Sequence, residues 1–387
     1  MRGSTERILT THVGALPAPA GLWANKNVPD AELQQAVSGV VAKQREVGLD
    51  FVNEGEFTKG GNWVEFVNSR LSGFEPRPAG GSRKLLFGSR DWEEFSDFYQ
   101  AAMEGGTLFE QTRSAPNQTR TMDWHCTGKV EYVGQAELAR EISCLRGALG
   151  SIPASDAFLT STAPSSIEPG RENTYYKTQE EFVFALADAL SVEYETIAKA
   201  GFNVQVDDAW LAALWDRIGI PMGLAAFQRY CAIRVEALNH ALRNIPETQI
   251  RYHLCWGSWH GPHSHDIPMK DIVGTLLSIK AQTYLFEAAN VRHEHEYRVW
   301  ETVKLPEHKL LAPGVVSHCT PLIEHPELVA SRIERFANIV GRERVLASTD
   351  CGMGLRCHPQ VAWAKLKSLG EGAALASSRL WARKSAA

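Results

Sequence analysis

One short segment of the chain places two residues that bind soft metals at strand spacing. In segment 251–255, His253 and Cys255 are separated by a single residue. Residues i and i+2 of an extended strand point to the same face, so the imidazole and the thiol project together. This pair suits Zn(II), which then needs a distant ligand to complete its set. We expect that ligand to be Cys351, which stands in the acidic, glycine-rich segment 348–354.

Spacing alone leaves other interpretations open. A core histidine beside a buried thiol accounts for the same pattern. Adjacent His and Cys residues compete for the metal, although in a strand such neighbours face opposite ways; the pairs are His125–Cys126, His318–Cys319 and Cys357–His358. Further histidines could form a second metal site, donate a proton or lie in solvent: His260, His263, His265, His293 and His295.

Short β-rich runs alternate with longer helical stretches along the chain, a pattern typical of parallel βα units. The expected strands are 8–13, 50–53, 129–133, 157–160, 203–206, 249–253, 283–286, 310–316 and 344–347. Helices are expected over 178–200, 220–244 and 327–340. In the first of these, apolar residues recur every four positions, which indicates one buried face.

Nine strands are one more than a (β/α)8 barrel needs, so we expect one to be peripheral. No repeat or linker marks a boundary, which predicts a single α/β TIM-barrel domain over residues 1–387. The segment 71–123, rich in Gly, Pro and charge, is expected to be an elaborated insertion, and such insertions are often functional. An open doubly wound sheet is the alternative, but no glycine-rich dinucleotide motif follows an early strand.

Polar residues follow the apolar strands at five places: 53–56, 205–208, 253–255, Glu287 and 349–351. These positions are carboxyl ends of parallel strands, where barrel enzymes place their chemistry. We therefore expect the five groups to converge on one site.

Composition narrows the class of protein. The chain has 387 residues, 22% charged and 44% hydrophobic, with a formal net charge of −5. This balance does not favour nucleic acid as a partner, and no apolar run approaches the roughly 20 residues that span a membrane. The charged N-terminus does not predict a secretory leader. Seven cysteines, an odd number in a long chain, predict reduced thiols and a cytoplasmic location. The sequence leaves open whether the chain forms a homo-oligomer.

Several strand-end segments occur in the order found in a known family. They are 10–17, 48–56, 205–209, 253–255, 286–287, 312–315 and 349–352. Together they resemble the catalytic domain of cobalamin-independent methionine synthase and its wider family of zinc thiol alkyltransferases, over about residues 8–356. The resemblance implies a TIM barrel and a Zn²⁺ cofactor held by His253, Cys255 and Cys351. It also implies that Glu287 is a fourth ligand that substrate can displace.

The same resemblance implies a substrate site. Glu56 and Asp207 match acidic residues that hold the amino group of homocysteine, and we place His12 and Asp208 with them as substrate-binding residues. Two departures from the synthase follow. Ala15 stands where the synthase has a serine that contacts its amino acid. Segment 159–164 lacks the Asn-Trp-Ser run associated with the pterin, which argues against a folate donor.

His12 and the segments 257–266 and 292–296 look more like the epoxyalkane:coenzyme M transferase branch. That branch opens an epoxide with a zinc-bound thiolate. Such a reaction needs an acid for the leaving alkoxide, and a histidine beyond the metal strand could supply it. We therefore predict His260, His263 and His265 as catalytic residues.

Three functions follow. The first is alkyl transfer to a small thiol, such as coenzyme M, from an epoxide or another small electrophile. The second is methyl transfer to homocysteine from a non-folate or corrinoid donor. The third, of another class, is a non-catalytic zinc- or ligand-binding barrel. A cofactor-free decarboxylase on a related barrel would leave the cysteines unexplained.

Overall fold

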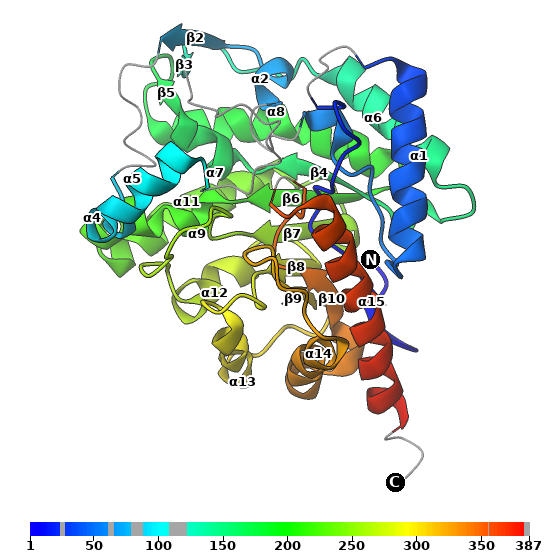
Figure 1. Ribbon diagram of the computed structural model, residues 1–387. Helices are drawn as coiled ribbons and strands as arrows, with labels where there is room; N and C mark the ends of the chain where they lie inside the picture. Colours follow the sequence, from blue (N-terminus) through cyan, green and yellow to red (C-terminus); the bar gives the residue numbers. More distant parts are fainter. Residues whose placement is uncertain (24–27, 61–65, 79–87, 108–121, 355, 383–387) are drawn as a thin grey trace.

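A curled parallel sheet forms the centre of the molecule (Figure 1). The computed structural model describes residues 1–23, 28–60, 66–78, 88–107, 122–354 and 356–382. Within these residues seven strands pair in the order β1-β10-β9-β8-β7-β6-β4, and every pair is parallel. The strands are β1 (Leu9–Thr10), β4 (Phe158–Thr162), β6 (Asn203–Asp208), β7 (Ile250–Leu254), β8 (Thr283–Phe286), β9 (Leu310–Val316) and β10 (Leu346–Thr349).

Residues 50–52 join the two edges of this sheet. The amides of Asp50 and Phe51 donate to Thr10 O at the β1 edge, at 3.0 and 3.1 Å. Val52 forms a parallel bridge with Ala157, next to β4 at the other edge. The segment predicted as strand 50–53 therefore contacts both ends of the sheet.

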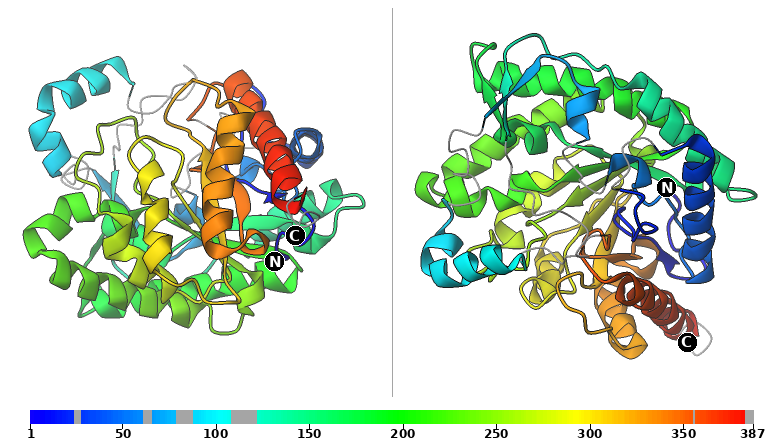
Figure 2. Two further views of the ribbon diagram at one scale, coloured as in Figure 1. Left: turned by 90° about the horizontal axis from the view of Figure 1, so that it is seen from below. Right: turned by 45° about the horizontal axis from the view of Figure 1, so that its top comes forward.

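Helices surround the sheet on its outer side (Figure 2). The longer ones are α1 (Asp30–Glu46), α5 (Ser96–Gly105), α6 (Gln135–Ala148), α8 (Gln179–Lys199), α11 (Leu224–Ala241), α12 (Met269–Leu277), α14 (Pro326–Val340) and α15 (Pro359–Ala382). The shorter ones are α2 (Val67–Arg70), α4 (Arg90–Glu94), α7 (Pro164–Ile167), α9 (Trp210–Ala213), α10 (Ile220–Met222), α13 (Val299–Thr302) and the π-helical turn Trp215–Gly219. None of the described helices is both long and apolar enough to cross a bilayer.

The predicted helix 178–200 is confirmed as α8, and its local sequence explains it. The Thr178 side chain accepts a hydrogen bond from Glu181 N, which caps the first turn. Phe182, Leu186 and Tyr194 are fully buried on one face, as their spacing predicts. The helix packs this face against the sheet.

The insertion predicted at 71–123 carries its own elements. A second sheet pairs β2 (Phe74–Pro78) with β3 (Met122–Cys126), and β3 with β5 (Arg171–Asn173). Helices α4 and α5 follow β2 in the chain and lie together at the left of Figure 1. Residues 79–87 and 108–121 of the predicted insertion lie outside the part of the chain that the structure describes.

Two predicted strands, 50–53 and 129–133, form only isolated bridges. Segment 129–133 forms only an isolated bridge between Tyr132 and Leu71. Within this segment the Val130 amide donates to the Tyr176 hydroxyl, and the backbone-to-backbone bonds among the described residues reach only residues 70–72. Its β-prone composition therefore does not place it in the central sheet. Of these two segments, 129–133 lies away from the seven-stranded sheet, whereas residues 50–52 bond to both of its edges.

Apolar side chains fill the inside of the curled sheet below the strand ends. This cluster contains Leu9, Val13, Phe51, Phe158, Leu285, Leu310, Ala312 and Leu346. The guanidinium of Arg251 lies over the Phe158 ring at 3.8 Å and donates to His12 O at 2.8 Å. This layer supports the polar residues at the carboxyl ends of the strands, where β7 continues from Arg251 to His253.

Candidate metal centre

Strands β7 and β10 bring together the three residues predicted as metal ligands. His253 lies in β7 and Cys255 follows its last residue, so both point to the inner face. Cys351 follows β10, and its Sγ lies 4.0 Å from that of Cys255 across 96 residues of sequence. The ligand atoms of the three residues all lie within 4.8 Å of one another.

The donor set fits a soft divalent cation. His253 Nδ1 bonds Asp207 Oδ1 at 3.0 Å, which orients the ring and directs Nε2 toward the thiols. His253 Nε2 is buried and has no hydrogen-bond partner among the described residues. An orphaned buried nitrogen beside two thiols is the arrangement that a zinc ion would satisfy.

Without a metal, the charges of this group already favour a thiolate. The hydrogen bond from Cys255 and the charge of His253 lower the pKa of Cys351 to about 6. Burial opposes the charge of His253, but Asp207 and Cys351 outweigh it and raise the pKa of His253 to about 9. Both shifts favour the charged pair of thiolate and imidazolium, and a metal bound here would take the place of the imidazolium proton.

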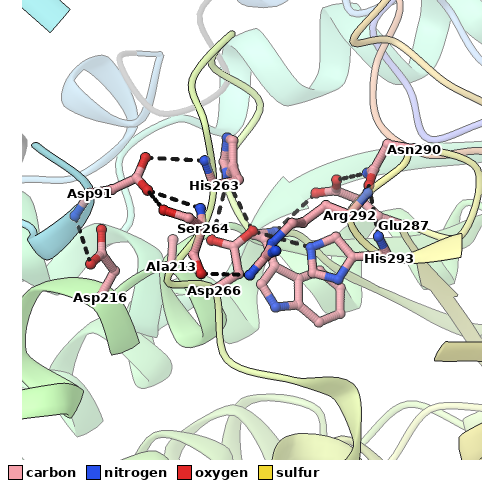
Figure 3. Close-up of polar contacts among 12 residues, drawn as sticks. Asp91, Ala213, Asp216, His263, Ser264, Asp266, Glu287, Asn290, Arg292 and His293 are labelled. Atoms are coloured by element: carbon pink, nitrogen blue, oxygen red, sulfur yellow. Dashed lines mark hydrogen bonds and ion pairs between the residues drawn. The ribbon is translucent and has the colours of Figure 1, made fainter. Parts of the chain in front are cut away.

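Glu287, the fourth predicted ligand, lies against Cys255. Its Oε1 is 3.6 Å from Cys255 Sγ and accepts the Trp256 amide at 3.1 Å. Its Oε2 accepts Asn290 Nδ2 at 2.6 Å (Figure 3). Burial raises the pKa of Glu287 to about 7, so a cation nearby would favour its carboxylate form.

Two further carboxylates, those of Glu56 and Asp207, lie close enough for their charges to interact. Glu56 has a left-handed backbone conformation, with φ of 60°, and accepts Thr160 Oγ1 at 2.9 Å. Burial, opposed by the buried Lys59 ammonium and increased by the charge of Asp207, raises the pKa of Glu56 to about 8. Gly14 makes room for this carboxylate, because a Cβ there would overlap Glu56 Oε1. A cationic group between Glu56 and Asp207 would relieve their repulsion.

The structure does not bring His12 and Asp208 into the same group. His12 is buried and bonds Gln44 Oε1 through Nε2 at 2.8 Å, and burial lowers its pKa to about 3. Asp208 points to the outer face of β6, opposite to Asp207. There it accepts hydrogen bonds from Ser165, Ser166 and Tyr252.

The three loop histidines are placed differently from one another. His263 bonds Trp259 O through Nε2 at 3.0 Å and Asp266 through Nδ1 at 3.0 Å. His265 bonds Glu94 on α4 at 2.6 Å and is partly exposed. His260 lies close enough for its charge to act on His318.

His318 follows β9 and was considered from the sequence only as a competing ligand. It is 1% exposed, and its Nδ1 has no hydrogen-bond partner among the described residues. Burial and the charges of Arg356, His260, His263 and His253 lower its pKa well below the ordinary value. Its place directly after a strand was the signal that could have assigned it to the site.

Comparison with known proteins identifies the family of the chain. The family model for the cobalamin-independent synthase catalytic domain matches residues 162–374. A methionine synthase of Thermococcus kodakarensis is 26% identical over 94% of this chain and 91% of its own length. A 2-hydroxypropyl-CoM lyase of Xanthobacter autotrophicus is 23% identical over the full length of both chains.

A solved structure shares the fold. The B12-independent methionine synthase of Shewanella sp. W3-18-1, in complex with selenomethionine, matches with a TM-score of 0.70 and 18% identity. The match covers 97% of this chain and 99% of that one. The family model matches more than half of the chain, and the strand-end residues His253, Cys255 and Cys351 all lie in the matched segment. The predicted resemblance is thus confirmed, and the chain belongs to the cobalamin-independent synthase catalytic-domain family.

Proposed function

We propose that this chain is a zinc-dependent enzyme that alkylates a small thiol. His253, Cys255 and Cys351 would hold the metal, with Glu287 as an exchangeable fourth ligand. The proposal rests on the two thiols 4.0 Å apart beside a buried imidazole nitrogen that lacks a partner. Bound there, Zn(II) would supply the positive charge that deprotonates a substrate thiol, whose pKa is otherwise near ~8.5.

The first candidate electrophile is an epoxide, with coenzyme M or a similar thiol as acceptor. Full-length similarity to a 2-hydroxypropyl-CoM lyase supports this choice. The leaving oxygen then needs a proton, and we assign that donation to the histidines of the loop after β7, His260, His263 and His265.

A second candidate is methyl transfer to homocysteine from a non-folate or corrinoid donor. The neighbouring carboxylates of Glu56 and Asp207 favour it, because they would attract the ammonium group of an amino acid. The same carboxylates would repel a sulfonate. Calorimetric titration with homocysteine and with 2-mercaptoethanesulfonate distinguishes the two candidates, since the preferred thiol should bind the zinc-loaded protein more tightly.

Zinc X-ray absorption tests the catalytic proposal itself. A catalytic site keeps an exchangeable position, whereas a structural site is closed by four protein ligands. We expect an added thiol to introduce a new sulfur ligand in place of an oxygen ligand. If no added thiol changes the zinc coordination shell, the result would favour a non-catalytic zinc-binding barrel.

We also propose that residues 1–387 form one domain, a (β/α)8 barrel in which segment 50–53 is the eighth strand. The backbone bonds of residues 50–52 to both sheet edges support this closure. Single-domain unfolding would follow, with one transition seen by every probe.

A further inference from the structure

Helix α4 of the insertion is anchored to the loop that follows the metal strand β7. Asp91 is 1% exposed and accepts four hydrogen bonds (Figure 3). The donors are the amides of His263 (3.1 Å) and Ser264 (2.9 Å), the Ser264 hydroxyl (2.5 Å) and the Tyr99 hydroxyl (2.6 Å). A buried carboxyl group that satisfies two loop amides fixes the path of that loop.

The other side of α4 is held to the body of the molecule. Asp216, in the π-helical turn after α9, accepts the amides of Arg90 (2.9 Å) and Asp91 (3.3 Å). The Tyr99 hydroxyl in turn accepts Trp259 Nε1 at 3.1 Å. Asp91 on α4 and Tyr99 on α5 therefore contact the loop 257–266, and Asp216 holds α4 to the body of the molecule.

Buried polar contacts lead from this loop to Glu287. His263 Nδ1 bonds Asp266, whose Oδ2 also bonds His293 Nε2 at 3.2 Å. The His293 amide donates to Asn290 Oδ1 at 3.0 Å, and Asn290 Nδ2 donates to Glu287 Oε2 (Figure 3). His263, Asp266, His293 and Asn290 are all buried or nearly so.

We propose that Asp91 is a positioning residue for the metal centre. It acts through the chain His263–Asp266–His293–Asn290, which sets the orientation of the Glu287 carboxylate and thereby the ease with which a thiol displaces it. This inference rests on the proposed function, because it takes Glu287 as the ligand that substrate replaces. It gives the α4–α5 insertion a role in substrate exchange, although no residue of α4 contacts the three thiol and imidazole ligands among the described contacts.

The first test needs no metal. Amide hydrogen exchange of the metal-free protein is compared between wild type, Asp91→Ala and the control Glu93→Gln, an exposed residue of the same helix. We expect Asp91→Ala to accelerate exchange at 257–266 and also at 287–293. Acceleration confined to 257–266 would overturn the proposal, because a local role would not reach Asn290.

The second test follows thiol binding in the cobalt-substituted protein by thiolate-to-cobalt absorption. The probes are homocysteine and 2-mercaptoethanesulfonate. We expect Asp91→Ala to change the Kd of the bound thiol about 10-fold, in the range seen for outer partners of metal ligands. Asp91→Asn keeps one carbonyl acceptor and is the milder variant if Asp91→Ala fails to fold. Its Kd for the thiol should lie between those of wild type and Asp91→Ala. Glu93→Gln should match wild type.

The outcomes separate this inference from the function it rests on. If wild-type cobalt protein responds to no thiol, the proposed function fails, and the exchange experiment still decides whether Asp91 is coupled to Glu287. If wild type binds a thiol and Asp91→Ala binds it with the same Kd, the positioning role is wrong while the function stands.

Discussion

At the scale of single residues, Cys351 is the proposed ligand whose loss should be most informative. Cys351→Ser replaces a soft thiolate by a hydroxyl that is not ionised at neutral pH. We expect zinc affinity to fall by more than the roughly 10- to 100-fold that the loss of an outer partner costs. Competition with a chromophoric chelator measures this change.

Cys144→Ser is the matched control for this variant. Cys144 is also buried, but it lies in α6, away from the strand ends. Its replacement should leave zinc affinity at the wild-type value. Full zinc retention by Cys351→Ser would contradict the ligand assignment.

Asp207 tests the choice of thiol. Asp207→Asn keeps an oxygen that can accept from His253 Nδ1, so the ring stays oriented, but removes a negative charge from beside Glu56. We expect binding of homocysteine to weaken roughly 10-fold or more, as for a lost charge-assisted hydrogen bond. Binding of 2-mercaptoethanesulfonate should be unchanged or tighter. Calorimetry with both thiols checks this, and an equal loss for both would indicate a structural role for Asp207.

At the scale of elements, the attachment of the two-residue strand β1 depends on Asp50. This carboxylate bonds Arg7, the Thr10 amide at 2.9 Å and the Thr10 hydroxyl at 3.0 Å. Burial opposes its charge, but Arg7 and Thr10 hold the pKa of Asp50 below its ordinary value. A lowered folded-state pKa stabilises the fold above the unfolded pKa of about 3.9, and this stabilisation is lost as pH falls through the folded value.

Asp50→Asn should therefore destabilise the protein more at pH 7 than at pH 3. We expect a loss of about 1 kcal/mol at pH 7, a modest figure because Arg7 is half exposed and its charge is screened. Urea midpoints at the two pH values measure it. Glu46→Gln, an exposed change on α1, should shift neither midpoint. A loss that grows toward pH 3 would contradict the assigned direction.

The elements that the sequence predicted well are those that local pattern determines. Strands 283–286 and 310–316 are confirmed at their predicted bounds because they are continuous apolar runs buried on both faces. Segment 129–133 alternates charged and apolar residues, and among the described residues its backbone pairs only with residues 70–72, outside the seven-stranded sheet. Pairing is a tertiary property that β-propensity does not contain.

The residues of the candidate site also divide into those that local pattern predicts and those that depend on tertiary contacts. His253 and Cys255 could be predicted because strand alternation is local, and Cys351 because strand ends converge. The bond of Asp91 to His263 joins residues 172 positions apart, through an insertion whose path no pattern predicts. The sequence therefore indicated the ligands and missed the residues that hold them.

At the scale of the whole molecule, the proposed ligands connect separate parts of one sheet. His253 belongs to β7 and Cys255 follows it, Glu287 follows β8, and Cys351 follows β10. A metal that binds all of them links strands up to 98 residues apart (residues 253 to 351) in the folded state only. Its binding free energy therefore adds to the stability of the entire fold.

Removal of zinc should consequently lower the thermal stability of the whole chain, not of the site alone. At a free zinc concentration about 1,000 times its Kd, binding contributes about 4 kcal/mol, which corresponds to a rise in Tm of roughly 5 °C for a protein of this size. Calorimetry of chelator-treated and zinc-loaded protein measures the difference. The rise should be largely absent in Cys351→Ser and retained in Cys144→Ser. An equal rise in Cys351→Ser would mean that zinc stabilises the fold from another site, and this centre would no longer account for it.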